Sequence, residues 1–380
     1  MMQENADIVI IGGGIVGLMT ARLLAREGAD VLLIEAGDLG AEASGANAGS
    51  IHLQIQYPEF VSYGEDWARA YTPCLRFLKT SLALWQDLPG ELWADLGVTL
   101  AGGLIAARTE AQMAHIRAKS VIEAEAGIET RILGRDDLLR LAPYLSSDAI
   151  GGGFCPLEGK ANPLQVTPHL AGSAAEAGAR IVTHTRVTGI ARQTGAYVVE
   201  TPRGAVRTGR IVNAAGAFAG RIGAMLGTHL DIDGFPLQVT VTEPVAAFIP
   251  HLVYSAAGKL SLKQLANGGC VIGGGWPARE RGNGVLVTDP KSLSGNMGMA
   301  AGVVPAIAAS RALRSWTAWV NGTPDWRPIL GEDPNAPGVI HALFPWVGFS
   351  AGPMTATVAA ALALGRPSPV GLKGLSLLYD

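Results

Sequence analysis

Charge excess, cysteine and long apolar runs are all scarce in this chain, and each scarcity excludes a class of protein. Lys and Arg number 29 against 32 Asp and Glu, so no positive surplus indicates a nucleic-acid-binding surface. The three cysteines, Cys74, Cys155 and Cys270, lie far apart and are odd in number. They therefore form neither a disulfide framework nor a metal cluster, and we expect buried thiols in a reducing compartment.

Apolar runs long enough to cross a membrane are also missing. The most apolar late stretch, residues 355–364, is short and rich in alanine, which is typical of a packed helix. No signal-peptide pattern precedes the first apolar strand, and nothing repeats at a solenoid period. These absences favour a cytoplasmic protein without a transmembrane segment.

Glycine and apolar residues, in contrast, are abundant. With 380 residues and 48% hydrophobic content, the chain can bury a large core, and its length predicts two domains. The 50 glycines suit tight turns and close approaches of the backbone to a ligand.

The most informative pattern lies near the N-terminus. An apolar strand over residues 7–11 leads into Gly12, Gly14 and Gly17, and the next apolar run ends at Glu35. This order predicts a unit that holds the adenosine half of a dinucleotide, with the pyrophosphate at the helix N-terminus. Glu35 can accept from a ribose hydroxyl, and its charge disfavours the 2′-phosphate of NADP. The alternative is a glycine turn without a ligand.

The rest of the chain alternates between helical and strand patterns. Polar and apolar residues alternate from Ser50 to Gln56, which predicts a half-buried strand with His52, Gln54 and Gln56 on one face. Helical patterns cover residues 60–88, with Pro73 as a start or break, 110–126, 163–178 and the surroundings of 297–310. Strand patterns cover residues 179–184, 187–193, 197–201, 204–210, 210–216 and 339–343, and β-rich patterning dominates from 236 to 275.

Four segments in this order resemble the D-amino acid oxidase (DAO) family of FAD enzymes. They are residues 12–17 with Glu35, residues 44–49, residues 212–216, and Pro324-Asp325 with residues 348–352. The resemblance implies an α/β fold in which a discontinuous Rossmann-like FAD-binding domain carries a second, β-rich substrate domain of the α+β type. We expect the FAD-binding domain to comprise residues 1–58, 150–228 and 320–380, and the substrate domain residues 59–149 and 229–319.

The resemblance also implies which residues hold the cofactor. The second glycine turn passes beside the flavin ring, and the last helix points its N-terminus at the pyrimidine side, where its dipole favours a reduced, anionic flavin. The residues expected to bind FAD are Gly12, Gly14, Ile15, Val16, Gly17, Glu35, Ala36, Ser44, Gly45, Asn47, Ala48, Gly49, Ser50, Val187, Ala214, Ala215, Gly216, Gly348, Phe349, Ser350, Ala351, Gly352, Pro353 and Met354.

A narrower resemblance concerns subunit composition. Residues 47–54, 321–326 and 344–353 are similar to the β subunits of heteromeric bacterial dehydrogenases for opines, D-hydroxyproline and proline. This similarity implies a catalytic β subunit with FAD and the amine site, an α subunit and a small iron–sulfur subunit as partners, and FMN at a subunit interface.

Some positions depart from relatives of the broader family. Phe349 follows Gly348 where oxidases often have a histidine, and His52 stands where several relatives carry an indole. No cysteine lies near residues 322–328, and Ala161 stands about where heterotetrameric sarcosine oxidases carry a flavin-linking histidine. We therefore expect FAD to be held without a covalent bond and no metal to take part.

Amine oxidation places two demands on the substrate pocket. The substrate Cα–H must lie over flavin N5 with the amine deprotonated, which an apolar aromatic pocket favours by desolvation. Trp276, Trp326, Trp346 and Phe349 are candidate walls, although each alone is more typical of plain core.

A substrate carboxylate also calls for a cation or several donors. Lys263 and Gln264 are adjacent on a strand expected over residues 259–265, so we expect one of them to face the cavity. His52 is a candidate hydrogen-bonding group or acid, and Gln54 shares its alternatives of a direct or a supporting role. The predicted catalytic residues are His52, Lys263, Gln264 and Trp346.

Three functions compete at this point. The preferred one is a dehydrogenase subunit that oxidises the C–N bond of an amino acid or secondary amine by hydride transfer to flavin N5. The second is a self-sufficient glycine, sarcosine or D-amino acid oxidase that produces hydrogen peroxide. The third is a noncatalytic FAD-binding assembly subunit, because fold alone does not establish function.

Overall fold

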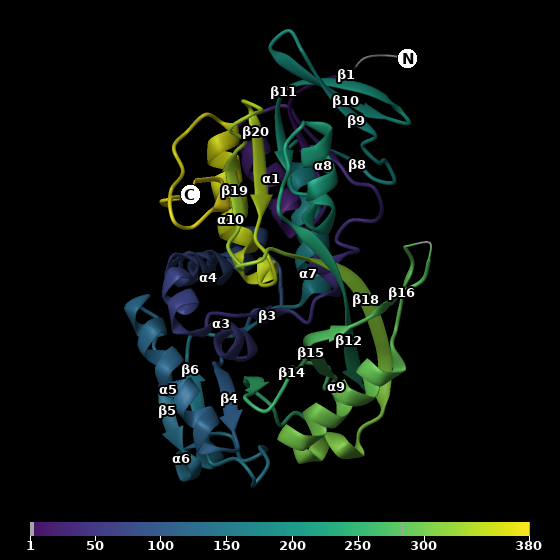
Figure 1. The fold of residues 1–380 in the computed structure, drawn as a ribbon. Coiled ribbons are helices and arrows are strands. Elements are labelled where there is room, and N and C mark those ends of the chain that lie inside the picture. The colour runs from purple at the N-terminus through teal and green to yellow at the C-terminus, as the bar shows by residue number, and fades with distance from the viewer. Residues whose placement is uncertain (1–3, 283, 380) are drawn as a thin grey trace.

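The computed structural model describes residues 4–282 and 284–379 and has two parts, each built on a large sheet (Figure 1). Both ends of the chain lie in the upper part of the view, while the middle of the chain forms most of the lower part. The predicted fold class is confirmed: a mixed α/β structure with an FAD-type sheet and a second mixed sheet.

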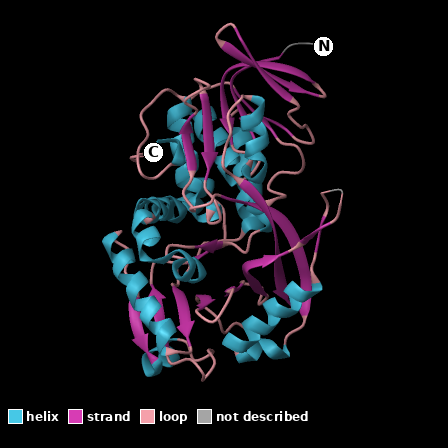
Figure 2. Ribbon diagram, in the orientation of Figure 1, coloured by secondary structure: helices cyan, strands magenta, loops and turns pink. Residues whose placement is uncertain are grey.

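The first sheet has a parallel centre. Its strand order is β19 (Ile329–Glu332), β20 (Val339–Leu343), β11 (Gly204–Asn213), β1 (Glu4–Ile11), β2 (Val31–Ile34) and β8 (Arg180–Val182), with β10 (Ala196–Thr201) and β9 (Gly189–Gln193) extending from β11. Helices α1 (Ile15–Arg26), α7 (Pro163–Glu176) and α10 (Gly348–Ala363) pack together beside it, as Figure 2 shows. Residues 8–11 of β1 and the whole of β2 are buried on both faces, which is why these stretches consist of Val, Ile and Leu.

The second sheet is mixed and forms the floor of the other part. Its order is β18 (Ala312–Gly322), β12 (Asp233–Thr242), β15 (Cys270–Pro277), β14 (Ser261–Gln264), β13 (Leu252–Ser255), β4 (Gly103–Ala107), β6 (Gly151–Cys155) and β5 (Arg131–Gly134). The larger helices of this half are α3 (Tyr57–Ala70), α4 (Thr72–Leu92), α5 (Glu110–Glu125), α6 (Arg135–Leu141) and α9 (Pro290–Val303).

The remaining elements are short. They are α2 (Ala43–Ala46), β3 (Ser50–Ile51), β7 (Gly159–Lys160), α8 (Ala219–Met225), β16 (Arg279–Glu280) and β17 (Leu286–Val287), with 3-10 turns at η1 (Gly216–Phe218), η2 (Pro305–Ala309) and η3 (Leu377–Tyr379). Helix α4 packs against α10, so the two parts share apolar core as well as loops.

Several predicted boundaries differ from the structure. The strand expected over residues 50–56 ends at Ile51, and the two strands expected over 204–216 are one continuous strand, β11. The helix expected over 60–88 is broken at Tyr71, next to Pro73. Strand β6 joins the second sheet, although the expected boundary at residue 150 assigned it to the FAD-binding domain.

Two expectations from composition can be compared with the described residues. Cys74, Cys155 and Cys270 are all buried with free thiols. Among the helices that the structure describes, none has the length and apolar content needed to cross a membrane.

A buried polar clamp holds the end of β11. The Asn213 side chain lies 3.1 Å from His341 Nδ1, and His341 Nε2 lies 3.0 Å from Asp333 Oδ2, with all three side chains buried. Burial lowers the pKa of His341, more than its bond to Asp333 raises it.

The clamp predicts acid sensitivity. The folded state disfavours protonated His341 more than the unfolded chain does. The stability that neutral His341 contributes is therefore fully present above about pH 6.5 and is lost as the pH falls below that value. We expect His341→Gln to reduce the dependence of the unfolding free energy on pH between 6.5 and 5.5 by up to about 1.4 kcal/mol per pH unit, as measured by urea titration. His169→Gln, at an exposed position on α7, should leave that dependence unchanged. An equal dependence in the wild type and His341→Gln would contradict the prediction.

Candidate active site

The N-terminal glycine turn has the tight geometry that a dinucleotide site needs. Gly12 has a φ of +114°, and a Cβ there would overlap the carbonyl of Ala214. A Cβ on Gly17 would overlap the Gly12 carbonyl oxygen. Glycine is therefore required at both positions for β1, the turn and α1 to pack.

The end of the turn presents backbone donors and a carboxylate. Helix α1 has no acidic residue in its first turn, and Gly14 provides no side-chain cap. The Ile15 amide donates to Ser44 Oγ at 2.9 Å, which ties the second loop to this helix. Glu35 accepts from the Gly13 and Gly37 amides, each at 2.7 Å, so its carboxylate lies against the glycine turn.

The other residues expected to bind FAD gather around the same turn. Ala214 and Ala215 lie so close to Gly12 that a side chain at this position would overlap them. The Ala214 backbone amide donates to the Ile11 carbonyl. Thr185, two residues before Val187, donates its amide to the Glu35 carbonyl, which brings this segment beside Glu35 and Ala36. These contacts place segments far apart in sequence around the carboxyl ends of β1, β2 and β11.

The loop before β3 is fixed by its own side chains. Asn47 donates to the carbonyls of Ala43 and Ser44 and accepts from the Gly49 amide at 2.5 Å. Gly49 has a φ of +78°, and a Cβ there would overlap the Ala161 carbonyl. Asn47, Ala48 and Ser50 all line the main cavity.

Helix α10 begins at the same cavity. It has no acidic residue in its first turn and no side-chain cap, while Val347, Phe349 and Ser350 line the cavity. Gly352 lies against Ile15, so the N-terminal turns of α10 and α1 are neighbours. A group of partial negative charge is favoured at each of these helix N-termini.

These features fit FAD. The crowded glycines leave room only for backbone at the turn, and Glu35 is placed for the ribose. Helices α1 and α10 have no acidic residue in their first turns, so their N-termini can favour the expected phosphate and flavin ends. Residues 12–17, 35, 44–50, 214–216 and 348–354 would hold the cofactor. Among the described residues no group of three or more His, Cys, Asp or Glu side chains is placed to hold a metal ion.

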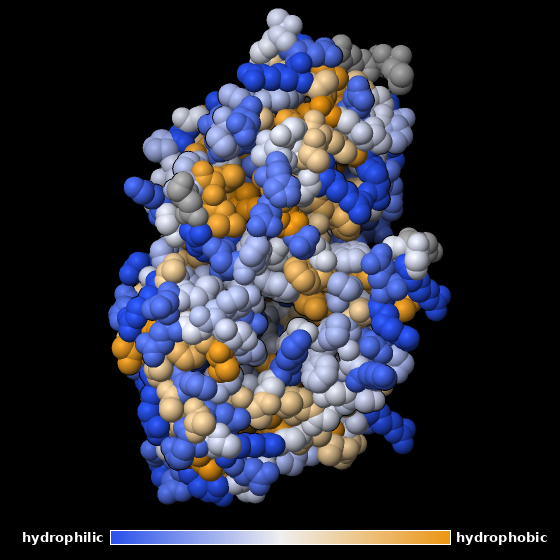
Figure 3. Space-filling view, in the orientation of Figure 1, coloured by the Kyte–Doolittle hydropathy of each residue, from blue (hydrophilic) through white to orange (hydrophobic). Residues whose placement is uncertain are grey.

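The main cavity lies between the two sheets and has a volume of about 580 Å³. Figure 3 shows the surface hollowed near the middle of this face. One wall is aromatic: Trp326 and Trp346 stack with ring centroids 5.3 Å apart, and Phe235 lies 4.6 Å from Trp346. Both tryptophans have positive φ, +71° and +55°, a conformation that bulky residues rarely adopt. The Trp346 indole N–H is buried and finds no partner among the described residues.

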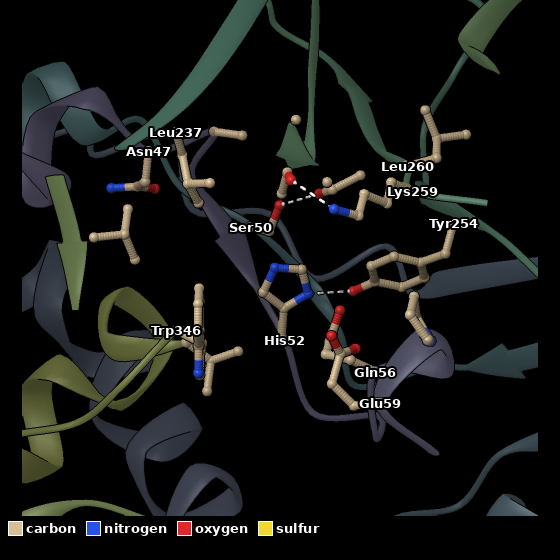
Figure 4. A pocket seen from close by; sticks show the side chains of 18 of the residues that line it. Asn47, Ser50, His52, Gln56, Glu59, Leu237, Tyr254, Lys259, Leu260 and Trp346 are labelled. Atoms are coloured by element: carbon tan, nitrogen blue, oxygen red, sulfur yellow. Dashed lines mark hydrogen bonds between the residues drawn. The ribbon is translucent and has the colours of Figure 1, made fainter. Parts of the chain in front are cut away.

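His52 projects into this cavity (Figure 4). Its Nδ1 lies 2.6 Å from the Tyr254 hydroxyl, and its backbone amide donates to Ser350 Oγ at 2.8 Å. Burial, with a smaller contribution from Lys263, lowers the pKa of His52 to about 3. The imidazole is therefore neutral at physiological pH and cannot serve as the acid near neutrality that the sequence suggested.

Lys263 lies behind the cavity wall. Its Nζ donates to Ser50 Oγ at 2.7 Å, and Ser50 Oγ is 2.9 Å from Ser261 Oγ. Lys263 is fully buried, and burial lowers its pKa well below the ordinary value. Lys263 therefore reaches the cavity only through the Ser50 hydroxyl.

Gln264 and Trp276 require correction. Gln264 points to the opposite face of the sheet, where its Oε1 accepts from the Phe248 and Ile249 amides, so it does not line the main cavity. Trp276 packs against Gly295 on α9 and is also outside it. Adjacent strand residues face opposite sides, and here Lys263 is the one on the cavity side.

Sequence reasoning missed several cavity residues. Tyr254 comes from the apolar strand β13, while Glu59 and Lys259 lie at the cavity from distant segments (Figure 4). Burial raises the pKa of Glu59, and the charge of Lys259 lowers it. No local pattern distinguishes these residues, because only the packing of α3 beside the second sheet brings them together.

A second cavity of about 850 Å³ lies on the other side of β14. It is lined by Lys160, Asn162 and Phe248, among others, and Lys160 Nζ donates to the Gln264 carbonyl at 2.5 Å. Exposed apolar side chains lie next to it in sequence: Trp93 is 94% exposed, two residues before Asp95, and Leu164 is 71% exposed, two residues after Asn162.

Comparisons with known proteins agree with this geometry. The family description "FAD dependent oxidoreductase" (DAO) matches residues 7–362. The chain is 28% identical to sarcosine oxidase subunit beta of Rhizobium meliloti, over 96% of this chain and 86% of that protein. It is 26% identical to glycine oxidase of Geobacillus kaustophilus, over 99% and 97% of the two chains.

Solved structures share the fold. The crystal structure of the G. kaustophilus glycine oxidase superposes with a TM-score of 0.87 at 23% identity and covers 100% of both chains, which shows a common fold. L-proline dehydrogenase from P. horikoshii superposes with a TM-score of 0.85 at 26% identity, over 97% of this chain and 96% of that one.

Proposed function

Because the chain belongs to the DAO family of FAD-dependent oxidoreductases, we propose that it oxidises the C–N bond of an amino acid or secondary amine of the opine, D-amino acid, proline or hydroxyproline type. The observation that carries the proposal is the aromatic cavity of about 580 Å³ that adjoins the cofactor-binding loop and the start of α10. FAD, when bound, supplies the hydride acceptor, N5.

The cavity walls prepare the substrate for this step. Trp326, Trp346 and Phe349 make the site apolar, which disfavours an ammonium ion and raises the fraction of neutral amine. Neutral His52 can receive a hydrogen bond from the substrate N–H and so orient the nitrogen. The N-terminus of α10 favours negative charge developing beside it.

Lys259 is the proposed partner of a substrate carboxylate. Of the described residues that line the cavity, Lys119 and Lys259 are the cations, and Lys119 is paired with Glu123 at 2.6 Å. Among the described residues, Lys259 Nζ donates to the Gly275 carbonyl at 3.2 Å, and the ammonium group has further donors for a ligand. The role we assign to Lys263 is to orient the Ser50 hydroxyl.

We further propose that the chain is the β subunit of a heteromeric dehydrogenase in the cytoplasm, with noncovalent FAD, an α subunit and a small iron–sulfur subunit. One relative is itself called a subunit. The second cavity, with Lys160 at its wall and Trp93 and Leu164 beside it, is our proposed place for FMN and the α subunit.

Trp93 gives a test of that interface. We expect Trp93→Asp to abolish copurification with the candidate partner subunits when these are co-expressed from the neighbouring genes. FAD content and folding should stay unchanged, because the indole is 94% exposed. Leu313→Asp, at an apolar position 66% exposed on β18, is the matched control and should copurify normally. Normal copurification of Trp93→Asp would exclude this face.

Activity is tested by following the flavin spectrum of the pure chain. Candidate amines should bleach the flavin under anaerobic conditions, and admitted air should restore the colour slowly. Rapid peroxide formation by the isolated chain would instead establish a self-sufficient oxidase, the function suggested by the similarity to glycine oxidase. The absence of bleaching with any amine would favour a noncatalytic FAD-binding subunit.

A further inference from the structure

The first turn of α10 is held by two side chains of the neighbouring helix α4. The Ser350 carbonyl accepts from Ser81 Oγ at 2.7 Å and from Trp85 Nε1 at 3.0 Å. Ser81 and Trp85 are four residues apart on α4, and both are fully buried, at 0% exposure. Because residues at this spacing lie on the same face of a helix, one face of α4 presents both donors to a single carbonyl.

The hydrogen-bond ladder of α10 is interrupted at the same place. Pro353 has no N–H, so the Phe349 carbonyl lacks its usual helical donor. The next amide, that of Met354, donates to Ser81 Oγ at 3.3 Å. The Ser81 hydroxyl thus bridges the Met354 amide and the Ser350 carbonyl, which bond directly in a regular helix. The position of the first turn of α10 therefore depends on α4.

This turn carries two groups of the main cavity. The Ser350 hydroxyl accepts from the His52 amide at 2.8 Å and donates to the Ser50 carbonyl at 3.2 Å, so it anchors the backbone on which His52 lies. Phe349, which lines the cavity, packs on Trp85 with ring centroids 4.9 Å apart. A displacement of the turn would therefore move a cavity wall and the His52 backbone together.

We propose that Ser81 and Trp85 are positioning residues for amine oxidation. From α4 they hold the first turn of α10, and through Ser350 and Phe349 they fix one side of the substrate cavity together with the His52 segment (residues 50–55). The effect on oxidation rests on the proposed function, whereas the link from α4 to His52 follows from the contacts alone. A carbonyl oxygen has two lone pairs, so either donor can hold the turn in part when the other is removed.

Single and double variants measure this link. Ser81→Ala and Trp85→Phe each remove one donor, and Trp85→Phe keeps an aromatic ring against Phe349. We expect each single variant of the FAD-loaded chain to slow anaerobic flavin reduction by an amine substrate by about two- to tenfold. The double variant should slow it by more than the product of the two single effects, because the Ser350 carbonyl then loses both donors.

Hydrogen exchange of the His52 amide gives a readout that needs no substrate. This amide donates to Ser350 Oγ, so its protection from exchange reports the position of the first turn of α10. In NMR of the 15N-labelled chain, the double variant should exchange this amide about tenfold faster or more, while the amides of β1 exchange as in the wild type. A general loss of stability would instead speed exchange at β1 as well. The single variants give the same readout at smaller amplitude and carry the test if the double variant does not fold.

Tyr197→Phe is the matched control. The Tyr197 hydroxyl donates to the Pro337 carbonyl at 2.9 Å from a side chain that is 3% exposed, so this variant also removes a buried donor from a carbonyl. Tyr197 belongs to β10, away from the residues that line the main cavity. Flavin reduction and exchange of the His52 amide should therefore stay unchanged.

Three results would overturn the inference. They are an unchanged exchange rate of the His52 amide in the variants of α4, an equal increase in exchange at β1, and unchanged flavin reduction by an amine that the wild type oxidises. If no amine reduces the wild-type flavin but the His52 amide responds as expected, the proposed function fails while the link from α4 to His52 is supported.

Discussion

Gly17→Ala is expected to fold but to lose its FAD. The added Cβ would overlap the Gly12 carbonyl oxygen, so α1 must move away from the turn that should receive the pyrophosphate. Overpacking of this kind costs about 1–3 kcal/mol. If most of this free-energy cost is expressed as weaker cofactor binding, the affinity for FAD falls by about tenfold or more. The measurement is the ratio of flavin to protein after gel filtration, with circular dichroism to verify the fold.

Gly172→Ala is the matched control for this substitution. Gly172 is also a helical glycine, but a Cβ there meets nothing within 4 Å. Alanine in a helix is more favourable than glycine by about 0.5–1 kcal/mol, so this variant should keep its FAD and gain slightly in stability. Full flavin content in Gly17→Ala would show that the dinucleotide does not depend on this contact.

The N-terminal glycine-turn unit was predictable because its information is local. The glycine turn, the apolar strands and Glu35 lie within one short segment, and each residue type is required by the backbone around it. The β20 bounds, residues 339–343, also match the prediction, since a fully buried strand has a distinct composition. Family membership and the FAD-type fold follow from these segments.

The substrate side was harder to predict because it depends on distant contacts. Residues 52–56 alternate like a strand, yet the amides of Leu53, Gln54 and Ile55 donate to buried carboxylates instead of a neighbouring strand. Those carboxylates belong to Glu158 and Glu123, about 70 to 105 residues away. An alternating pattern cannot distinguish these two ways of satisfying the backbone.

Lys119 is the cation of this buried network. Glu123 and Glu158 supply two carboxylates, and Lys119 contacts Glu123 directly and Glu158 through Gln54. We expect Lys119→Met to lower the free energy of unfolding by about 3–5 kcal/mol, the usual effect of removing one partner of a buried ion pair. Urea unfolding followed by circular dichroism measures the change.

The pH dependence of this defect has a definite sign. Burial raises the pKa of Glu158 and the charge of Lys119 lowers it, so removing Lys119 moves the folded pKa of Glu158 further above the unfolded value. A raised folded pKa contributes stability at low pH and loses it as the pH increases. Lys119→Met should therefore be closer to the wild type at pH 5.5 than at pH 8.

Arg117→Met on the same helix separates burial from charge. Arg117 and Glu110 form an ion pair of 3.7 Å with side chains 54% and 80% exposed, so its removal should change stability by less than about 1 kcal/mol. Adding Glu123→Gln to Lys119→Met should recover part of the lost stability, because the amide oxygen can still accept from Ile55 without a buried charge. Equal effects of Lys119→Met and Arg117→Met would mean that the network does not stabilise the His52 segment.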